Sequence, residues 1–239
     1  MPLPKIATPT YELELPSTGQ SVRYRPFLVK EEKVLVIALE SEDNKQITTA
    51  IKAVLKSCVL TKGIKVETLP TFDIEYLFLN IRGKSVGETI DVNIICPDDE
   101  KTSVKVEIDL DDIKVQKTEG HTNKVELDKN LMMELKYPSL DEFIKNNFDF
   151  KDENAMEQSF KLIASCIDKI YTDEEVWAAG ACTKKELTEF LESMNSSQFK
   201  KIEEFFTSMP KLSHTIKVKN PNTKVESEVV LEGLASFFG

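Results

Sequence analysis

Residues 11–24, YELELPSTGQSVRY, alternate apolar and polar side chains on both sides of a short turn sequence. A period of two is typical of a half-buried β-strand, and Pro16-Ser17-Thr18-Gly19 contains residues that favour a turn. The polar positions include Glu12 before the turn and Arg23 after it. Opposite charges across an antiparallel pair help to fix its register. We therefore predict a β-hairpin near the start of the sequence.

Three helices should follow this hairpin, because the period of the apolar residues changes from two to about 3.6. Residues 29–41 are apolar nearly all round, which predicts a buried helix. Between residues 47 and 59 the apolar side chains fall on one stripe, which predicts an amphipathic helix. A third helix should begin after Pro70, with Thr71 as its cap, and should end at Gly83.

An acidic antiparallel sheet is expected within residues 88–137. Apolar and polar residues alternate over residues 90–96 and 104–110, on either side of the turn Pro97-Asp98-Asp99-Glu100. Further short strands are expected at residues 113–115, 125–127 and 131–137.

Helices should dominate again from residue 139. Ser139 with Glu142, Thr172 with Glu175, and Thr183 with Glu186 each fit a capping box that begins a helix. Apolar stripes with helical spacing follow, over residues 160–170, 187–194 and 199–209. A hairpin with the turn Asn220-Pro221-Asn222 should close the chain, followed by the apolar tail Leu234–Phe238.

These patterns together predict a mixed α+β fold built mainly from antiparallel β-hairpins and amphipathic helices. We expect three segments. Residues 1–87 should form the N-terminal hairpin and helical unit, residues 88–137 the central acidic sheet, and residues 138–239 the C-terminal helical unit with its closing hairpin.

The charge balance excludes a general nucleic-acid binder. The 239 residues include 31 Lys and Arg against 41 Asp and Glu, a net charge of -10, whereas phosphate binding needs a basic surplus. Residues 86–175 carry 11 basic and 23 acidic side chains, so the acidic excess lies in the middle of the chain. This region is either a solvated acidic face or a docking surface for a basic partner.

The cysteines and the apolar runs indicate a cytosolic protein or part of a soluble assembly. The four cysteines are widely spaced with no CxxC pair, which favours a reducing compartment, and Cys58 and Cys166 should be core residues. The longest unbroken apolar run, Val34–Leu39, is too short to insert across a membrane.

The sequence offers no pattern typical of a catalytic, metal or cofactor site. His121 and His214 are the only histidines, and neither has a neighbour at the spacing of metal ligands or of a catalytic triad. Gly83-Lys84-Ser85 resembles the end of a phosphate-binding loop, but Phe78 stands where that loop needs a glycine. We therefore expect no enzyme and no cofactor.

Several stretches stand out as landmarks: residues 3–6, 16–19, 24–33 and 40–41, followed by 71–78, 82–88, 108–113 and 209–212. They resemble a family of baseplate proteins from T-even-type contractile-tailed bacteriophages. The resemblance extends over most of the chain and is densest in residues 3–90. It implies a component of the baseplate hub, or a factor that helps the hub to assemble, and it implies no enzyme.

This resemblance also implies partners and a location. The partners would be other baseplate hub proteins or further copies of the same chain, with neither nucleic acid nor membrane insertion. The protein would act in the cytoplasm of the infected host cell, and a permanent component would end in the virion tail baseplate. Two alternatives stay open: an acidic adaptor that binds proteins, and a tail-associated hydrolase whose site is built from dispersed residues.

Candidate interface residues follow from the same landmarks. A polar cluster beside a hydrophobic hairpin exit is suited to protein contacts, and the apolar end of the chain could serve as an anchor. The candidates are Arg25, Pro26, Phe27, Lys30, Glu31, Glu32, Lys33, Phe237 and Phe238. Glu31 and Glu32 could instead simply form the acidic first turn of a helix.

Overall fold

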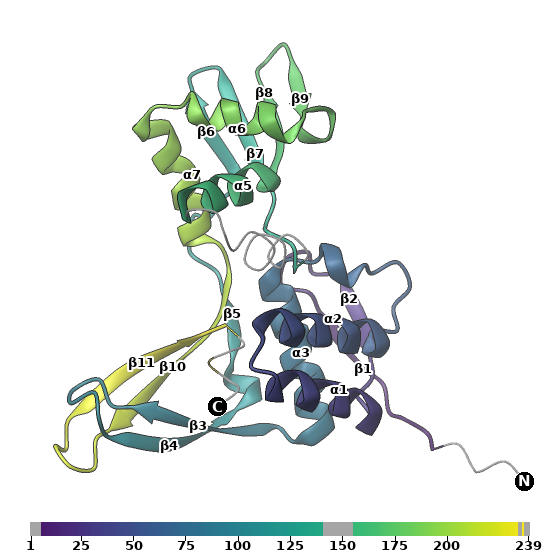
Figure 1. Ribbon diagram of the computed structural model, residues 1–239, viewed down its shortest axis with the longest axis vertical. Coiled ribbons are helices and arrows are strands. Elements are labelled where there is room, and N and C mark those ends of the chain that lie inside the picture. The colour runs from purple at the N-terminus through teal and green to yellow at the C-terminus, as the bar shows by residue number, and fades with distance from the viewer. Residues whose placement is uncertain (1–5, 141–154, 234–235, 237–239) are drawn as a thin grey trace, which may run out of the picture. The chain divides into compact units, whose positions relative to one another are not determined.

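The computed structural model describes residues 6–140, 155–233 and 236. Contacts between residues divide the chain into two compact units: unit 1 contains residues 1–66, 72–116 and 211–239, and unit 2 contains residues 67–71 and 117–210. Figure 1 shows their elements, which are helices and small antiparallel sheets. The predicted α+β class is confirmed. The three expected segments, 1–87, 88–137 and 138–239, do not coincide with these units, because the chain leaves unit 1 and later returns to it.

Unit 1 begins with the expected hairpin. Strands β1 (Tyr11–Glu14) and β2 (Ser21–Tyr24) pair antiparallel, and Glu12 lies opposite Arg23 as the charge pattern predicts. The turn is joined to the third helix, because the Ser17 N–H donates to Asp73 Oδ1 at 3.0 Å and the Ser17 hydroxyl donates to Asp73 Oδ2. Asp73 is fully buried, and these hydrogen bonds from Ser17 satisfy its carboxylate.

Three helices complete this part of unit 1: α1 (Val29–Glu40), α2 (Asn44–Cys58) and α3 (Thr71–Val86). The stripe of α2 is confirmed, and its buried members are Ala50, Ile51, Val54, Leu55 and Cys58. The prediction that α3 ends at Gly83 is wrong, because the helix continues to Val86. Gly83 lies inside the helix, where a Cβ atom would be 3.1 Å from the Leu110 side chain. Gly87 follows the last turn with a φ of 132°.

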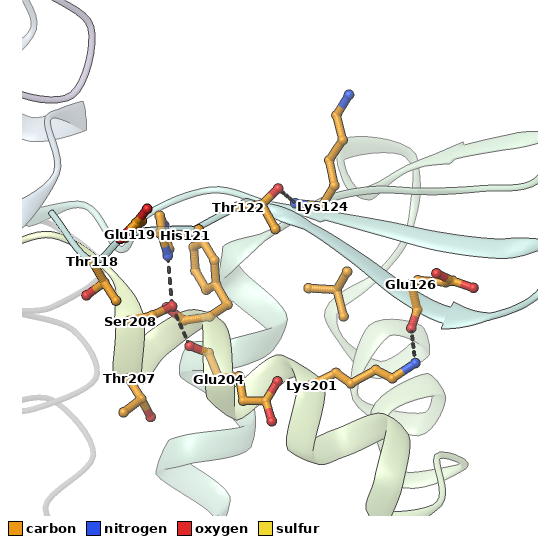
Figure 2. Close-up of a pocket in the computed structure, with 13 residues that line it drawn as sticks. Thr118, Glu119, His121, Thr122, Lys124, Glu126, Lys201, Glu204, Thr207 and Ser208 are labelled. Atoms are coloured by element: carbon orange, nitrogen blue, oxygen red, sulfur yellow. Dashed lines mark hydrogen bonds between the residues drawn. The ribbon is translucent and has the colours of Figure 1, made fainter.

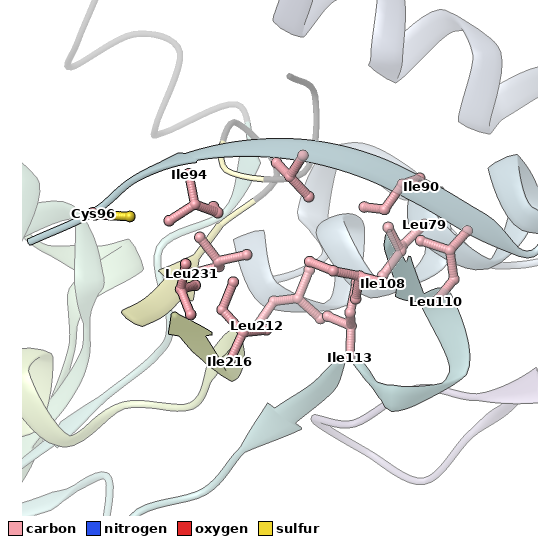
Figure 3. Close-up of a cluster of buried hydrophobic side chains, with 12 residues drawn as sticks. Leu79, Ile90, Ile94, Cys96, Ile108, Leu110, Ile113, Leu212, Ile216 and Leu231 are labelled. Atoms are coloured by element: carbon pink, nitrogen blue, oxygen red, sulfur yellow. The ribbon is translucent and has the colours of Figure 1, made fainter. Parts of the chain in front are cut away.

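Two antiparallel sheets form the rest of unit 1. Strands β3 (Thr89–Ile95) and β4 (Ser103–Asp109) make one sheet, and β11 (Glu226–Glu232), β10 (Lys211–Lys219) and β5 (Lys114–Gln116) make the other. Their apolar faces and Leu79 of α3 share one buried cluster (Figure 3). The members labelled there are Leu79, Ile90, Ile94, Cys96, Ile108, Leu110, Ile113, Leu212, Ile216 and Leu231.

The strands expected within residues 88–137 are present, but they do not form one sheet. β3 and β4 pair with each other, β5 pairs with β10, and the remaining strands belong to unit 2. β5 pairs with β10 and β7 pairs with β8, both distant in sequence, and an alternation pattern carries no information about such a partner.

The tips of the two long hairpins of unit 1 are held together by a polar clasp. Buried Asn220 donates from Nδ2 to both carboxylate oxygens of Asp98, at 3.0 and 3.1 Å. Its own Oδ1 accepts from the backbone N–H of Asn222 at 2.9 Å and of Thr223 at 3.3 Å. Asn220 therefore shapes its own turn and binds the neighbouring hairpin with a single side chain.

The described part of unit 2 packs three helices against a four-stranded sheet. The strands are β6 (Lys124–Asp128), β7 (Leu131–Leu135), β8 (Ile167–Tyr171) and β9 (Val176–Ala178), in that order. The helices are α5 (Ala155–Cys166), α6 (Lys184–Glu192) and α7 (Ser196–Ser208). They share a second core, which includes Met133, Ile167, Leu191, Ile202 and Phe205.

The helical stripe predicted over residues 160–170 is corrected by the structure. Helix α5 ends at Cys166 and strand β8 begins at Ile167. The pairing of β7 with β8 shifts register between Glu134 and Leu135, and both Ile167 and Ile170 are buried. Such a bulge puts residues three apart on one face of a strand, which imitates the spacing of a helix.

The three predicted capping boxes have different outcomes. The box at Thr183 is confirmed, since Thr183 Oγ1 accepts from the Glu186 N–H and the Glu186 carboxylate accepts from the Thr183 N–H. Thr172 instead closes the β8–β9 turn, where its Oγ1 accepts from the N–H groups of Glu174 and Glu175. Glu142 of the third box lies outside the described residues.

We predict that the substitution Asn220→Ala lowers the free energy of unfolding by about 1–3 kcal/mol, because it leaves Asp98 and two turn N–H groups without their buried partner. Urea denaturation of the full chain measures this change. The exposed Asn93, on β3 of the same unit, supplies the control Asn93→Ala, which should change the unfolding free energy far less. Equal effects of the two substitutions would contradict the clasp.

Candidate functional site

A buried ion pair joins the exit of the β1–β2 hairpin to the first turn of α1. Arg25 Nη2 lies 3.0 Å from Glu31 Oε1. Arg25 Nη2 also donates to the Ser57 hydroxyl of α2 at 2.9 Å, and this hydroxyl donates to Glu31 Oε1 at 2.8 Å. The other carboxylate oxygen, Oε2, accepts from the backbone N–H of Leu28 at 2.8 Å. Glu31 therefore connects the hairpin, α1 and α2 through one side chain.

The surroundings of Glu31 strongly favour its ionised form. Burial alone would raise the pKa of this carboxyl group, since the side chain is only 7% exposed. The hydrogen bonds from Arg25, Ser57 and the Leu28 N–H, together with the charge of Arg25, outweigh burial and lower the pKa to about 2. Glu31 is thus a charged structural group at neutral pH.

The predicted interface residues around this ion pair have unequal exposure. Pro26, Phe27 and Glu31 are buried, and the Phe27 N–H donates to Ser85 of α3 at 2.9 Å. Lys30 and Lys33 are exposed. The acidic-first-turn interpretation therefore describes Glu31 well, whereas the interface role of the cluster stays a prediction. Residues 237 and 238 lie outside the described residues.

Helix α1 is not the buried helix that its composition predicts. Its inward stripe consists of Glu31, Leu35 and Ala38, at the helical spacing i, i+4 and i+7. The other apolar side chains face outward with large exposed fractions: Val29 79%, Val34 45%, Val36 46%, Ile37 56% and Leu39 45%. We call these five residues the α1 face. Exposed apolar side chains gathered on one helix are typical of a protein-binding surface.

An apolar groove of about 350 Å³ adjoins the α1 face. It lies within unit 1, and its lining comes from the hairpin exit and from all three helices of that unit. Val36 and Leu39 belong both to the α1 face and to the lining, and Phe78 of α3 closes the floor as a nearly fully buried side chain. Glu32 and Arg82 are the charged lining residues, and burial lowers the pKa of the Arg82 guanidinium.

A second, more polar cavity of about 630 Å³ lies in unit 2 beside His121 (Figure 2). His121 Nδ1 is 2.9 Å from the Ser208 hydroxyl, and Nε2 is 2.9 Å from the Tyr137 hydroxyl. The imidazole also packs against the rings of Tyr137 and Phe205, with centroid separations of 5.7 and 5.3 Å, and those two rings stack on each other at 5.6 Å. His121 is therefore a partly buried packing residue.

The positions of the protons at His121 do not suit a serine nucleophile. Ser208 Oγ is 2.6 Å from the Glu204 carbonyl oxygen, to which it donates its only proton. Nδ1 of His121 must then donate to Ser208, and Nε2 must accept from Tyr137. A general base would instead accept the serine proton, so this pair does not form the first step of a hydrolase mechanism. Burial lowers the pKa of His121, which favours the same neutral form.

Other chemistry-bearing side chains have structural positions. Cys58 and Cys166 are buried, as predicted, and Cys96 is buried as well. Burial raises the pKa of Cys58 to about 11. Among the described residues, no three His, Cys, Asp or Glu side chains are arranged to hold a metal ion. None of the helices in the described part of the chain is long and apolar enough to cross a membrane.

Comparison with known proteins identifies the family. The model of the T4 bacteriophage base plate protein family matches residues 8–239, which is nearly the whole chain. The chain therefore belongs to this family of phage baseplate proteins. No curated protein and no solved structure matches it. Membership supports a structural role in the tail baseplate and contacts with other baseplate proteins, and it favours a role other than catalysis.

The outward orientation of the α1 face is not predicted by the apolar pattern of the sequence. The residue that could have indicated this orientation is Glu31, which occupies the same helical stripe as Leu35 and Ala38. If that carboxylate is turned inward, most of the apolar residues of α1 must turn outward. The period of the apolar residues alone does not show this, because they surround the helix.

We predict that Glu31→Gln lowers the free energy of unfolding at neutral pH by about 2–3 kcal/mol, because a neutral amide cannot replace a carboxylate that accepts from three donors. Since the folded-state pKa is lowered to about 2, the stability due to ionisation is fully present above about pH 4.5 and is lost as the pH falls toward 2.

Urea denaturation between pH 2 and 7 tests this prediction. The wild-type chain should lose more stability than Glu31→Gln as the pH falls through this window. The control Glu40→Gln changes an exposed carboxylate at the other end of α1 and should keep the wild-type pH profile. Identical profiles for the wild type and Glu31→Gln would show that the ion pair does not stabilise the fold.

Proposed function

We propose that the protein is a component of the baseplate hub or a factor that assembles the hub, and that it acts through protein–protein contacts. Family membership supports the baseplate role. The observation that carries the proposal further is the α1 face, an exposed apolar surface beside an apolar groove on the same unit. Such surfaces are uncommon on proteins that act alone and mark sites of association.

The occupant we propose is an apolar face of a helix from another hub protein. A groove formed by helices is suited to receive a further helix, whose side chains at i, i+3, i+4 and i+7 can enter it. Val36 and Leu39 would contact the entering side chains, the exposed Ile37 would contact the partner beside the groove, and Glu32 and Arg82 would form a polar rim. An apolar centre with a polar rim is the usual anatomy of protein interfaces.

The proposed contact would form while the hub assembles, which indicates where the protein would act. Hub precursors meet in the cytoplasm of the infected host cell, and the protein would hold them in an arrangement that can continue to assemble. A permanent hub component would then remain in the virion tail baseplate. The same face could alternatively bind a further copy of the chain, and light scattering separates that outcome from a mixed complex.

The alternative role as an acidic adaptor receives less support from the fold. It requires a continuous acidic surface over residues 88–137. The strands of that segment instead belong to three separate sheets, of which two lie in unit 1 and one in unit 2. Salt dependence distinguishes the two roles, because screening weakens an ionic contact and hardly affects an apolar one.

The experiment is size-exclusion chromatography with light scattering of the full chain, mixed with each hub protein of the same phage at low and high salt. We expect one mixed complex that persists at both salt concentrations and that the double variant Val36→Glu/Ile37→Glu weakens at least tenfold. Both side chains are about half exposed, so the variant should fold, which circular dichroism verifies.

The matched control Thr49→Glu/Ala53→Glu introduces the same two acidic side chains at exposed, neutral positions of α2. It should leave the complex intact. Binding that the α1 variant does not weaken, or a complex that dissociates at high salt, would contradict a contact through the α1 face. A failure of every hub protein to bind would contradict the hub role itself.

A further inference from the structure

Among the described residues, strand β9 is an edge strand of the sheet in unit 2, with no further strand beside it. It is the last strand in the order β6-β7-β8-β9 and pairs with β8 through Tyr171 and Val176, Ile170 and Trp177, and Lys169 and Ala178. All three residues of β9 are exposed, with Val176 at 66% and Trp177 at 42%. Trp177 is the only tryptophan of the chain. Tryptophan is among the residues most enriched where proteins bind one another.

The register shows which backbone groups of β9 are available to another strand. The Thr172 N–H donates to the Glu175 carbonyl at 2.8 Å, which closes the β8–β9 turn. Hydrogen-bonded and non-hydrogen-bonded pairs alternate along an antiparallel ladder. Trp177 therefore directs its N–H and C=O toward Ile170, whereas Val176 directs both groups toward the open edge.

The opposite edge of the same sheet is protected, whereas no described residue hydrogen-bonds to the outward backbone groups of Val176; on β9 the Cys182 thiol donates to the Ala178 carbonyl at 3.6 Å. On β6, Lys201 Nζ of α7 donates to the Glu126 carbonyl at 2.7 Å, and Gln198 Nε2 donates to the Leu127 carbonyl at 3.3 Å. β6 also carries charged residues, which discourage pairing with another chain. The sequence of β9, Val-Trp-Ala, contains neither a charge nor a proline.

An apolar row leads across the sheet to this edge. Met132 of β7 lies opposite Tyr171 of β8, and Tyr171 lies opposite Val176 of β9. Cross-strand partners share one face of a sheet. Their neighbours Met133 and Ile170 are buried on the other face, so the row belongs to the face that points away from the core, where Met132 and Tyr171 are partly exposed.

The charge beside the edge indicates what kind of segment would pair with it. The β8–β9 turn carries three consecutive exposed carboxylates, Asp173, Glu174 and Glu175, and none of them forms an ion pair with a described residue. Lys169, the basic residue of β8, is already paired with Glu134 at 3.1 Å. The edge is therefore apolar along the strand and strongly acidic at the turn.

We propose that β9 receives an extended, basic segment of a partner protein, which pairs with Val176 as a fifth strand of the sheet. Backbone hydrogen bonds to the open edge would supply affinity that does not depend on sequence. Lysine or arginine side chains of the segment would lie beside Asp173–Glu175, and its apolar side chains would contact Val176 and Trp177. This surface belongs to unit 2 and does not require the α1 face.

Trp177 provides a fluorescence signal at the proposed site. The full chain is titrated with two ten-residue peptides, one of alternating lysine and valine and one of alternating glutamate and valine. We expect a saturable change of Trp177 emission with the lysine peptide, at least tenfold tighter than with the glutamate peptide and weaker as salt is added. A lysine peptide that is N-methylated at every backbone amide should bind at least tenfold more weakly, because neither of its edges can donate to the ladder.

Charge reversal at the turn supplies the matched variants. Asp173→Lys/Glu174→Lys should invert the preference, so that the glutamate peptide binds more tightly. The control Glu192→Lys/Glu203→Lys makes the same charge change at exposed helical positions of unit 2 and should leave the preference unchanged.

Four results would overturn the proposal: no saturable change with the lysine peptide, equal affinity for both charged peptides, no effect of the N-methyl groups, or identical behaviour of the two double variants. A dimer in light scattering that Val176→Lys abolishes would also overturn it, because the fifth strand would then come from a second copy of this chain.

Discussion

The inward position of Glu31 determines which side of α1 meets solvent. A carboxylate that is almost fully buried must be paired, and Arg25, Ser57 and the Leu28 N–H hold it at the junction of the hairpin with the helices. Leu35 and Ala38 follow it on the same stripe. The remaining apolar residues of α1 are then directed outward, where they form the surface on which the proposed function depends.

This arrangement has an energetic cost that a partner would offset. Turning the helix so that its apolar residues faced inward would bury more apolar area, but it would expose or unpair Glu31. An unpaired buried charge costs several kcal/mol, more than the burial of one or two further aliphatic side chains returns. The exposed face is thus a consequence of the ion pair, and burial against another baseplate protein would recover the hydrophobic stabilisation.

Much of the fold follows from local patterns, and the failures have identifiable causes. The β1–β2 register, the stripe of α2 and the capping box at Thr183 depend on neighbouring residues, so the sequence predicts them correctly. The bulge in β8 imitates helical spacing. The partner of β5 is β10, and residues 117–210 separate the two strands in the sequence, so local patterns do not predict their pairing. The α1 face could not be predicted from apolar periodicity, because the buried stripe begins with a charged residue.

The family places the chain in the phage baseplate, and the structure offers two surfaces of different chemistry for contacts there. Hydrogen–deuterium exchange of the α1 backbone tests the central claim most directly, with the protein measured alone and within a purified baseplate hub complex. The account predicts that amides of residues 28–40 become more protected in the complex, while those of β10 and β11 keep their exchange rates. Unchanged exchange over residues 28–40 in a complex that demonstrably contains the protein would contradict it.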